Sequence, residues 1–272
     1  MAHRALFISL ILFSGAGLAE HHEDAALAAA LAGDQRESGT AARDQYRHPG
    51  ETLAFFGIKA DMKVIEIRPG GSAWYTQILA PYLRDSGELT VAVAGLDAAI
   101  GYQVKGTQRQ FERFKNNPGV YGKVKHVVFQ PAKDKTKLGE SNSVDMVLTF
   151  RNAHNWHRRG YLPGILASMF DVLKPGGILG VVQHRAAAGT NPDETAPRGY
   201  LSQAAVVEMV TKAGFELEDA SEVNANPKDL RDYPEGVWTL PPRLRLGDQD
   251  RDKYLAIGES DRMTLRFVKP GS

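Results

Sequence analysis

The chain has 272 residues, of which 43% are hydrophobic and 24% charged, and this composition is typical of a globular protein and excludes a disordered or fibrous one. The length suits one large α/β domain, or one domain with extensions. The net charge of +1 falls to zero without the first 19 residues, which hold one arginine and no acid, so charge gives no reason to expect nucleic acid or an anionic membrane as partner. The absence of cysteine excludes disulfides and thiolate metal sites.

The first 19 residues have the pattern of a cleavable signal peptide. A short basic start containing Arg4 precedes the apolar run 5–13, which is too short to span a bilayer, and Gly17-Leu18-Ala19 has the small residues of a cleavage site. No cysteine follows, so a lipoprotein anchor is excluded. We therefore expect a periplasmic or secreted protein with no membrane anchor; the alternative is a retained N-terminal helix.

Residues 20–57 are expected to form a helical extension in front of the main domain. Residues 23–47 are rich in alanine and predict helix, with a break at Gly39. Pro49 is suited to the first position of a further helix that Gly57 ends. Tyr46 is a candidate substrate contact and Arg47 a second candidate ligand contact, although lid packing and a solvated charge are the favoured explanations.

The chain is organised around residues 63–83. An apolar strand at 63–67 is followed by the turn Pro69-Gly70-Gly71 and by a helical pattern at 73–83. Strand, glycine turn and helix are the opening unit of nucleotide-binding α/β domains, because glycine allows the backbone to approach a ligand closely. A dinucleotide-binding turn would read G-x-G-x-x-G, and this turn does not. A βα turn without any ligand is the alternative.

The pattern Glu66-x-x-Pro69-Gly70-Gly71 resembles motif I of the class I S-adenosylmethionine-dependent methyltransferases. The resemblance implies that Glu66, Arg68, Pro69, Gly70 and Gly71 surround the methionine end of that cofactor. Arg68 departs from the motif, where the family has glycine. The acid that the family places at the end of the second strand, here 89–94, is also missing; Asp97 follows a few residues later and either reaches the ribose or caps the next helix.

Further polar residues follow the third strand at 123–129 and the fourth at 142–150. Gln130 stands where the family places a polar side chain near adenine. The stretch after strand four holds Asn152, predicted to bind the cofactor, His154, a candidate general base, and Asn155 and Trp156, predicted to bind substrate. The carboxyl end of a central strand is where open α/β sheets bind ligands, which favours a functional role over a neutral loop.

The remaining elements complete the resemblance. A helix at 161–173 ends in Lys174-Pro175-Gly176-Gly177, a further family signature, and the fifth strand at 178–182 leads to His184, a second candidate base or a buried histidine. A loop at 186–200, a helix at 202–213 and a sixth strand at 215–223 precede the long connection 224–260, expected to cover the substrate, and the seventh strand at 262–268. The resemblance implies a doubly wound, Rossmann-like seven-stranded sheet over residues 58–272, with the last strand antiparallel.

The function expected from the resemblance is methyl transfer from S-adenosylmethionine to an unknown acceptor, with a small molecule as the expected partner. The particular residues resemble an exported branch of predicted methyltransferases. Arg68, the displaced acid and the expected export leave open a non-catalytic binding protein on the same fold. A nicotinamide-dependent oxidoreductase is a weaker alternative. No metal site is expected, because the histidines lack ligand spacing.

Overall fold

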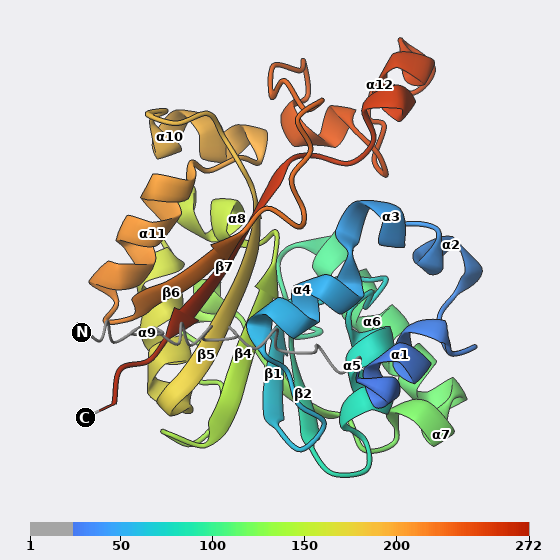
Figure 1. The fold of residues 1–272 in the computed structure, drawn as a ribbon, viewed down its shortest axis with the longest axis vertical. Helices are drawn as coiled ribbons and strands as arrows, with labels where there is room; N and C mark the ends of the chain where they lie inside the picture. Colours follow the sequence, from blue (N-terminus) through green and yellow to red (C-terminus); the bar gives the residue numbers. More distant parts are fainter. Residues whose placement is uncertain (1–23, 272) are drawn as a thin grey trace, which may run out of the picture.

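The computed structural model describes residues 24–271 as a seven-stranded sheet covered by helices on both faces (Figure 1). The strand order is β3-β2-β1-β4-β5-β7-β6, with β1 to β5 parallel and β7 antiparallel to both of its neighbours, so the predicted doubly wound sheet with an antiparallel last strand is confirmed. The strands are β1 (Lys63–Ile67), β2 (Glu88–Val93), β3 (Lys125–Val128), β4 (Val144–Phe150), β5 (Leu173–His184), β6 (Glu216–Ser221) and β7 (Arg262–Val268).

Helices precede, connect and follow these strands. Four of them, α1 to α4, come before β1, and the rest lie in the crossovers and in the connection before β7. The helices are α1 (Ala25–Ala32), α2 (Ser38–Ala41), α3 (Asp44–Arg47), α4 (Pro49–Phe56), α5 (Thr76–Leu83), α6 (Gly101–Asn116), α7 (Pro118–Tyr121), α8 (Ala153–His157), α9 (Leu162–Val172), α10 (Pro192–Thr195), α11 (Gln203–Lys212) and α12 (Arg251–Ile257). Among residues 24–271, no helix has the length and apolar content needed to cross a bilayer.

Two hydrophobic cores lie on opposite faces of the sheet, because successive side chains of a strand point to opposite sides. In β1, Val64 packs with α1, α4 and α5, whereas its neighbour Ile65 packs with α9 and α11. In β4, Met146 and Val147 divide in the same way. The continuous apolar runs of the central strands are therefore explained by burial on both faces.

The structure differs from the sequence-based prediction in three segments. The N-terminal helical region does not break at Gly39, which lies inside α2; it breaks at 33–37, where the Gln35 amide donates to the Ala30 carbonyl (2.7 Å) and Arg36 pairs with Asp44 (2.6 Å). The fifth strand begins at Leu173 rather than at residue 178, because Leu173 pairs with Val144 before a bulge. The expected loop at 186–200 contains α10 and a short 3-10 helix, Ala196–Arg198.

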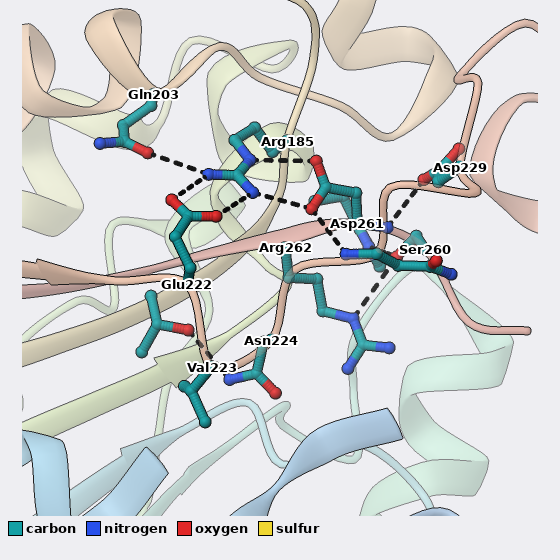
Figure 2. A network of polar contacts seen from close by, with 12 residues as sticks. Arg185, Gln203, Glu222, Val223, Asn224, Asp229, Ser260, Asp261 and Arg262 are labelled. Carbon is teal, nitrogen blue, oxygen red and sulfur yellow. Dashed lines mark hydrogen bonds and ion pairs between the residues drawn. The ribbon is translucent and has the colours of Figure 1, made fainter. Parts of the chain in front are cut away.

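The connection between β6 and β7 is held to the sheet by buried charges (Figure 2). Asp261, 2% exposed, accepts from Arg185 at the end of β5 (2.9 and 3.0 Å) and from Arg231 within the connection (2.7 Å). Arg185 also forms a bidentate pair with Glu222 (2.5 and 2.6 Å). In Figure 1 this orange-to-red connection stands above the end of the sheet, near α8. These contacts fix the position of one wall of the cavity described next.

Two predictions concern residues outside this description. The proposed signal peptide at 1–19 lies outside the described residues, as do the first residues of the predicted extension.

Candidate functional site

A cavity of about 470 Å³ opens at the carboxyl ends of β1, β4 and β5. Chain order reverses between β1 and β4, since β2 lies on one side of β1 and β4 on the other, and such switch points bind ligands in open α/β sheets. Segments from four parts of the chain line the cavity. They are Arg43 and Arg47; Glu66, Arg68 to Ser72, Trp74, Tyr75 and Arg109; Phe150 to Asn152, His154, Asn155 and His184; and Val237, Trp238, Pro241 to Arg243, Glu259 and Ser260.

The glycine turn forms one wall with an unusual backbone. Gly70 has a φ of +75°, and a Cβ added there would meet no atom within 4 Å, so its open side faces free space. Arg68 (φ +56°), Ala73 (φ +46°) and Arg151 (φ +63°) also adopt the left-handed conformation, which non-glycine residues rarely do. Strained backbone of this kind concentrates at ligand-binding sites, and here Arg68 and Arg151 line the cavity, while Ala73 stands in the chain between the lining residues Ser72 and Trp74.

Glu66 lies beneath this turn and is 1% exposed. Its Oε2 accepts a hydrogen bond from Thr76 Oγ1 at 2.5 Å. Burial raises the pKa of Glu66 to about 7, although the Thr76 hydroxyl and the positive charge of Arg151 act in the opposite direction. The acid is therefore divided between its two protonation states near neutral pH, and a cation placed beside it would favour the ionised form.

The Arg68 side chain extends along the end of the sheet toward β3. Its Nη1 donates to the Phe129 carbonyl after β3 at 3.4 Å, so the side chain crosses the end of β2, which lies between β1 and β3. Asp97, after β2, is exposed and pairs with Lys133 at 2.7 Å, and it does not line the cavity. Gln130 is 6% exposed and its Oε1 has no hydrogen-bond partner among the described residues. The cavity thus contains Arg68, Pro69 and Gly71 but neither Asp97 nor Gln130.

The two candidate bases, His154 and His184, lie together in the cavity wall with ring centroids 5.7 Å apart. The Asn155 amide nitrogen lies 2.8 Å from His154 Nε2, and the Gln183 amide lies beside His154 Nδ1, with Nε2 at 3.1 Å and Oε1 at 3.3 Å. His184 Nδ1 lies 2.6 Å from the Ser260 hydroxyl. Burial lowers the pKa of His154 to about 4 and that of His184 well below its ordinary value, so both imidazoles are neutral at pH 7. Neither imidazole therefore keeps the near-neutral pKa that makes histidine suitable as a general base.

The other predicted site residues are divided between the cavity and its surroundings. Asn152 lines the cavity and donates to the Ile67 carbonyl (3.1 Å), which joins the ends of β4 and β1. Asn155 lines it beside His154. Trp156 is 6% exposed and packs edge-on against Phe129 in the core, because on α8 it faces the sheet rather than the cavity. Tyr46 packs near Gly258 and does not line the cavity, whereas its neighbour Arg47 does.

Apart from Arg47, sequence reasoning missed the residues that the N-terminal helices and the connection bring to the cavity. Arg47 Nε pairs with Glu259 Oε2 at 3.1 Å, and Arg43 Nε pairs with Glu259 Oε1 at 2.6 Å. Trp74 lies under the Arg47 guanidinium, 4.7 Å from ring centroid to Cζ, and Tyr75 stacks on Phe150 at 3.6 Å. Among the lining residues that were not predicted, Arg151 had a sequence signal, because it directly follows strand four.

Comparison with solved structures identifies the fold. A SAM-dependent methyltransferase from Aquifex aeolicus is similar with a TM-score of 0.55 and 16% identity, covering 84% of this chain and 93% of that one. The [4+2]-cyclase SpnF gives 0.57 and 18%, covering 89% and 86%. A putative sarcosine dimethylglycine methyltransferase from Galdieria sulphuraria gives 0.54 and 12%, covering 86% and 88%. No protein-family model and no curated protein sequence matches the chain.

The strand order and these similarities define the class I methyltransferase fold, a Rossmann-like sheet with an antiparallel seventh strand, here preceded by helices. The similar structures include a cyclase as well as methyltransferases, so the fold alone does not specify the reaction.

Proposed function

We propose that the protein is an S-adenosylmethionine-dependent methyltransferase acting on a small molecule. The observation that carries this proposal is Gly70, whose open side faces the cavity at the switch point of the sheet, directly above the buried acid Glu66. A side chain at residue 70 would fill the space that the turn leaves for a ligand.

The described residues fit the two ends of the cofactor unequally. At the methionine end, Glu66 would accept from the ammonium group, and the Gly70–Gly71 backbone and Asn152 would lie alongside it. At the adenosine end, the unpaired buried Oε1 of Gln130 is a ready acceptor, but Arg68 crosses this region and Asp97 is engaged by Lys133. When bound, the cofactor supplies a methyl group on a sulfonium, which is already a strong electrophile.

The protein's contribution to such a reaction is mainly to hold donor and acceptor close and collinear. A cavity of about 470 Å³ is large enough for a small ligand and is closed on one side by Trp238 and Pro241 from the connection. His154 and His184 are weak proton acceptors because burial lowers the pKa of each. They suit the roles of hydrogen-bonding and orienting an acceptor better than removing a tightly held proton.

A non-catalytic binding protein on this fold is the second candidate. It is favoured by one observation, the path of Arg68 across the end of β2, where the adenosine would otherwise lie. In this case the cavity binds a ligand without the methyl donor.

Titration calorimetry with S-adenosylmethionine and S-adenosylhomocysteine separates the two candidates. We expect both to bind the wild-type chain. Gly70→Val should abolish this binding, because the added side chain occupies the ligand's space. The positive φ of residue 70 adds roughly 1–3 kcal/mol of backbone strain in the valine variant, which most domains tolerate. Circular dichroism verifies that the variant is folded.

Arg68→Gly is the companion variant. If Arg68 obstructs the adenosine, restoring glycine should strengthen binding; if Arg68 contacts the cofactor, binding should weaken. A wild-type chain that binds neither compound, or a folded Gly70→Val that binds as tightly as the wild type, contradicts the proposed function.

A further inference from the structure

The cavity has a large excess of positive charge. Among the described residues, six arginines line it and only two acids, Glu66 and Glu259. The arginines are Arg43, Arg47, Arg68, Arg109, Arg151 and Arg243. Arg109 and Arg243 are exposed at the rim, but Arg47 is 3% exposed and Arg43, Arg68 and Arg151 are half-buried. Guanidinium groups removed from water repel one another more strongly than they do in solvent.

Glu259 does not balance the charges around it. This single carboxylate, 4% exposed, is shared by Arg43 (2.6 Å), Arg47 (3.1 Å) and Arg262 (2.6 Å). Within residues 24–271, buried Nη1 of Arg47 and buried Nη2 of Arg43 have no hydrogen-bond partner. Buried donors without partners are uncommon in folded proteins, because each has lost its water, so they require an explanation.

Arg151 adds a further unbalanced cation. No hydrogen bond or ion pair of its guanidinium is found in the described part of the chain, and its backbone is strained at a φ of +63° to place it at the end of β4. Arg47 lines the same cavity, and its pKa is lowered by burial and by the positive charge of Arg151. Burial also lowers the pKa of Arg151 itself to about 10. Arg151 therefore remains cationic at neutral pH despite the cost.

The proposed methyl donor does not supply the missing negative charge. S-adenosylmethionine carries a sulfonium, an ammonium and one carboxylate, so its binding brings one more net positive charge into the cavity. Ionised Glu66 offsets at most one charge. If the protein is a methyltransferase, the compensating anion must come from the other ligand.

We propose that the acceptor substrate is an anion whose oxyanion group, a carboxylate or a phosphate, is bound by Arg47 and Arg151. The assignment of this anion as the methyl acceptor rests on the proposed function, whereas the oxyanion site itself rests on the arginines alone. Planar guanidinium groups match the oxygen atoms of carboxylate and phosphate, and such charge-assisted hydrogen bonds are about twice as strong as neutral ones.

The test is titration calorimetry with inorganic phosphate and with malonate, each added to protein saturated with S-adenosylhomocysteine. We expect at least one of the two to bind, and the comparison tells phosphate from carboxylate recognition. Arg151→Gln and Arg47→Gln should each weaken this binding about tenfold or more, since each removes one charged donor. Arg151→Gln is the decisive variant, because nothing in the described structure pairs with Arg151 and its loss should leave the fold intact.

Arg251→Gln is the matched control. Arg251 is exposed at the start of α12, and its replacement removes the same charge away from the cavity, so binding should be unchanged. No binding of either anion by the wild type, equal binding by Arg151→Gln, or equal weakening by Arg251→Gln would each overturn the proposal. Displacement of the anion by S-adenosylhomocysteine would also overturn it, because the arginines would then hold the cofactor's carboxylate.

The same titrations distinguish this proposal from the proposed function. If S-adenosylhomocysteine does not bind but phosphate or malonate binds through Arg151, the methyltransferase proposal fails and the oxyanion site stands.

Discussion

Burial of the single residue Glu66 makes the stability of the folded protein depend on pH. Its carboxyl has an ordinary pKa of 4.5 and a pKa of about 7 in the fold. Between these pH values the unfolded chain releases the proton while the folded chain retains it. Rising pH therefore lowers the stability of the folded state, and the loss is complete above pH 7.

Glu66→Gln should remove this pH dependence. Glutamine is neutral at every pH and can still accept from Thr76, so relative to wild type the variant should gain about 3 kcal/mol of unfolding free energy between pH 4 and pH 8. The measurement is urea unfolding of both proteins across this range. The difference between the two proteins is used because His154, with its lowered pKa, makes the wild-type stability fall on acidification. Glu194→Gln, at an exposed carboxylate, controls for the loss of one charge; a pH-independent difference for Glu66→Gln would contradict the prediction.

Single residues were predictable where their role is local. Gly70 and Glu66 were found because a turn and a buried strand impose their residue types over a few positions. Asp97 stands close to the expected place in the sequence, yet its carboxylate pairs with Lys133, 36 residues away. Arg43 contacts Glu259 across 216 residues, and no local pattern could indicate this pair.

At the scale of elements, the connection before β7 forms part of the cavity wall although it has little regular structure. Figure 2 shows two of the contacts that fix its position: Asp261 accepts from Arg185, and its own backbone N–H donates to Asp229 (2.8 Å). Asp261 also accepts from Arg231 (2.7 Å). Removal of this buried carboxylate would take away the ion-pair partner of Arg231 and leave Arg185 paired with Glu222 alone.

Asp261→Ala should therefore destabilise the protein by about 3–5 kcal/mol, and the connection should become sensitive to protease. Glu222→Ala is the matched control, because Glu222 is the other ion-pair partner of Arg185 and its own side chain is 66% exposed. This substitution should lower the free energy of unfolding by less than about 1 kcal/mol. Urea unfolding gives the free energies, and trypsin cleavage after Arg243 or Arg245 reports release of the connection. Equal effects of the two substitutions would show that burial of Asp261 has no special importance.

Element boundaries were predicted best where chain-local signals mark both ends. Strand β1 and strand β7 match their predicted residues, bounded by turns or by a change in hydrophobic pattern. The break in the N-terminal helices was misplaced because Gln35 and Arg36 end α1 through contacts with other segments, including the Gln77 carbonyl (3.1 Å) on α5. The aromatic ring of Trp156 was assigned to the site by its neighbours in sequence, but the direction of a side chain on α8 depends on how the helix packs.

At the scale of the whole molecule, the sheet provides the glycine turn and the polar ends of β4 and β5, and the N-terminal helices and the connection before β7 close the cavity. Arg43 and Arg47 come from the N-terminal helices, and Trp238, Glu259 and Ser260 come from the late connection. The motifs that resemble methyltransferases lie between these segments. Sequence resemblance therefore indicates the side of the cavity formed by the glycine turn, and the opposite side depends on parts of the chain that carry no shared motif.

The N-terminal helices bear on the proposed export as well. Helix α1 begins after Asp24, which accepts from the backbone N–H groups of Ala26 (2.9 Å) and Leu27 (3.1 Å) and from the Tyr82 hydroxyl. We propose that a signal peptide is cleaved after Ala19, which leaves Asp24 and all contacts of α1 in the mature chain.

A chain that begins at Glu20 should then unfold with the same free energy as the full-length chain, whereas one that begins at Ala25 should lose about 1 kcal/mol with its helix cap. Urea unfolding compares the three chains. In cells that express the full sequence, N-terminal sequencing of protein from the periplasmic fraction should begin at Glu20, because small residues at 17 and 19 suit the cleavage site. Recovery of an intact chain with Met1 from the cytoplasm would contradict export, and a clear loss of stability in the Glu20 chain would show that residues before it belong to the fold.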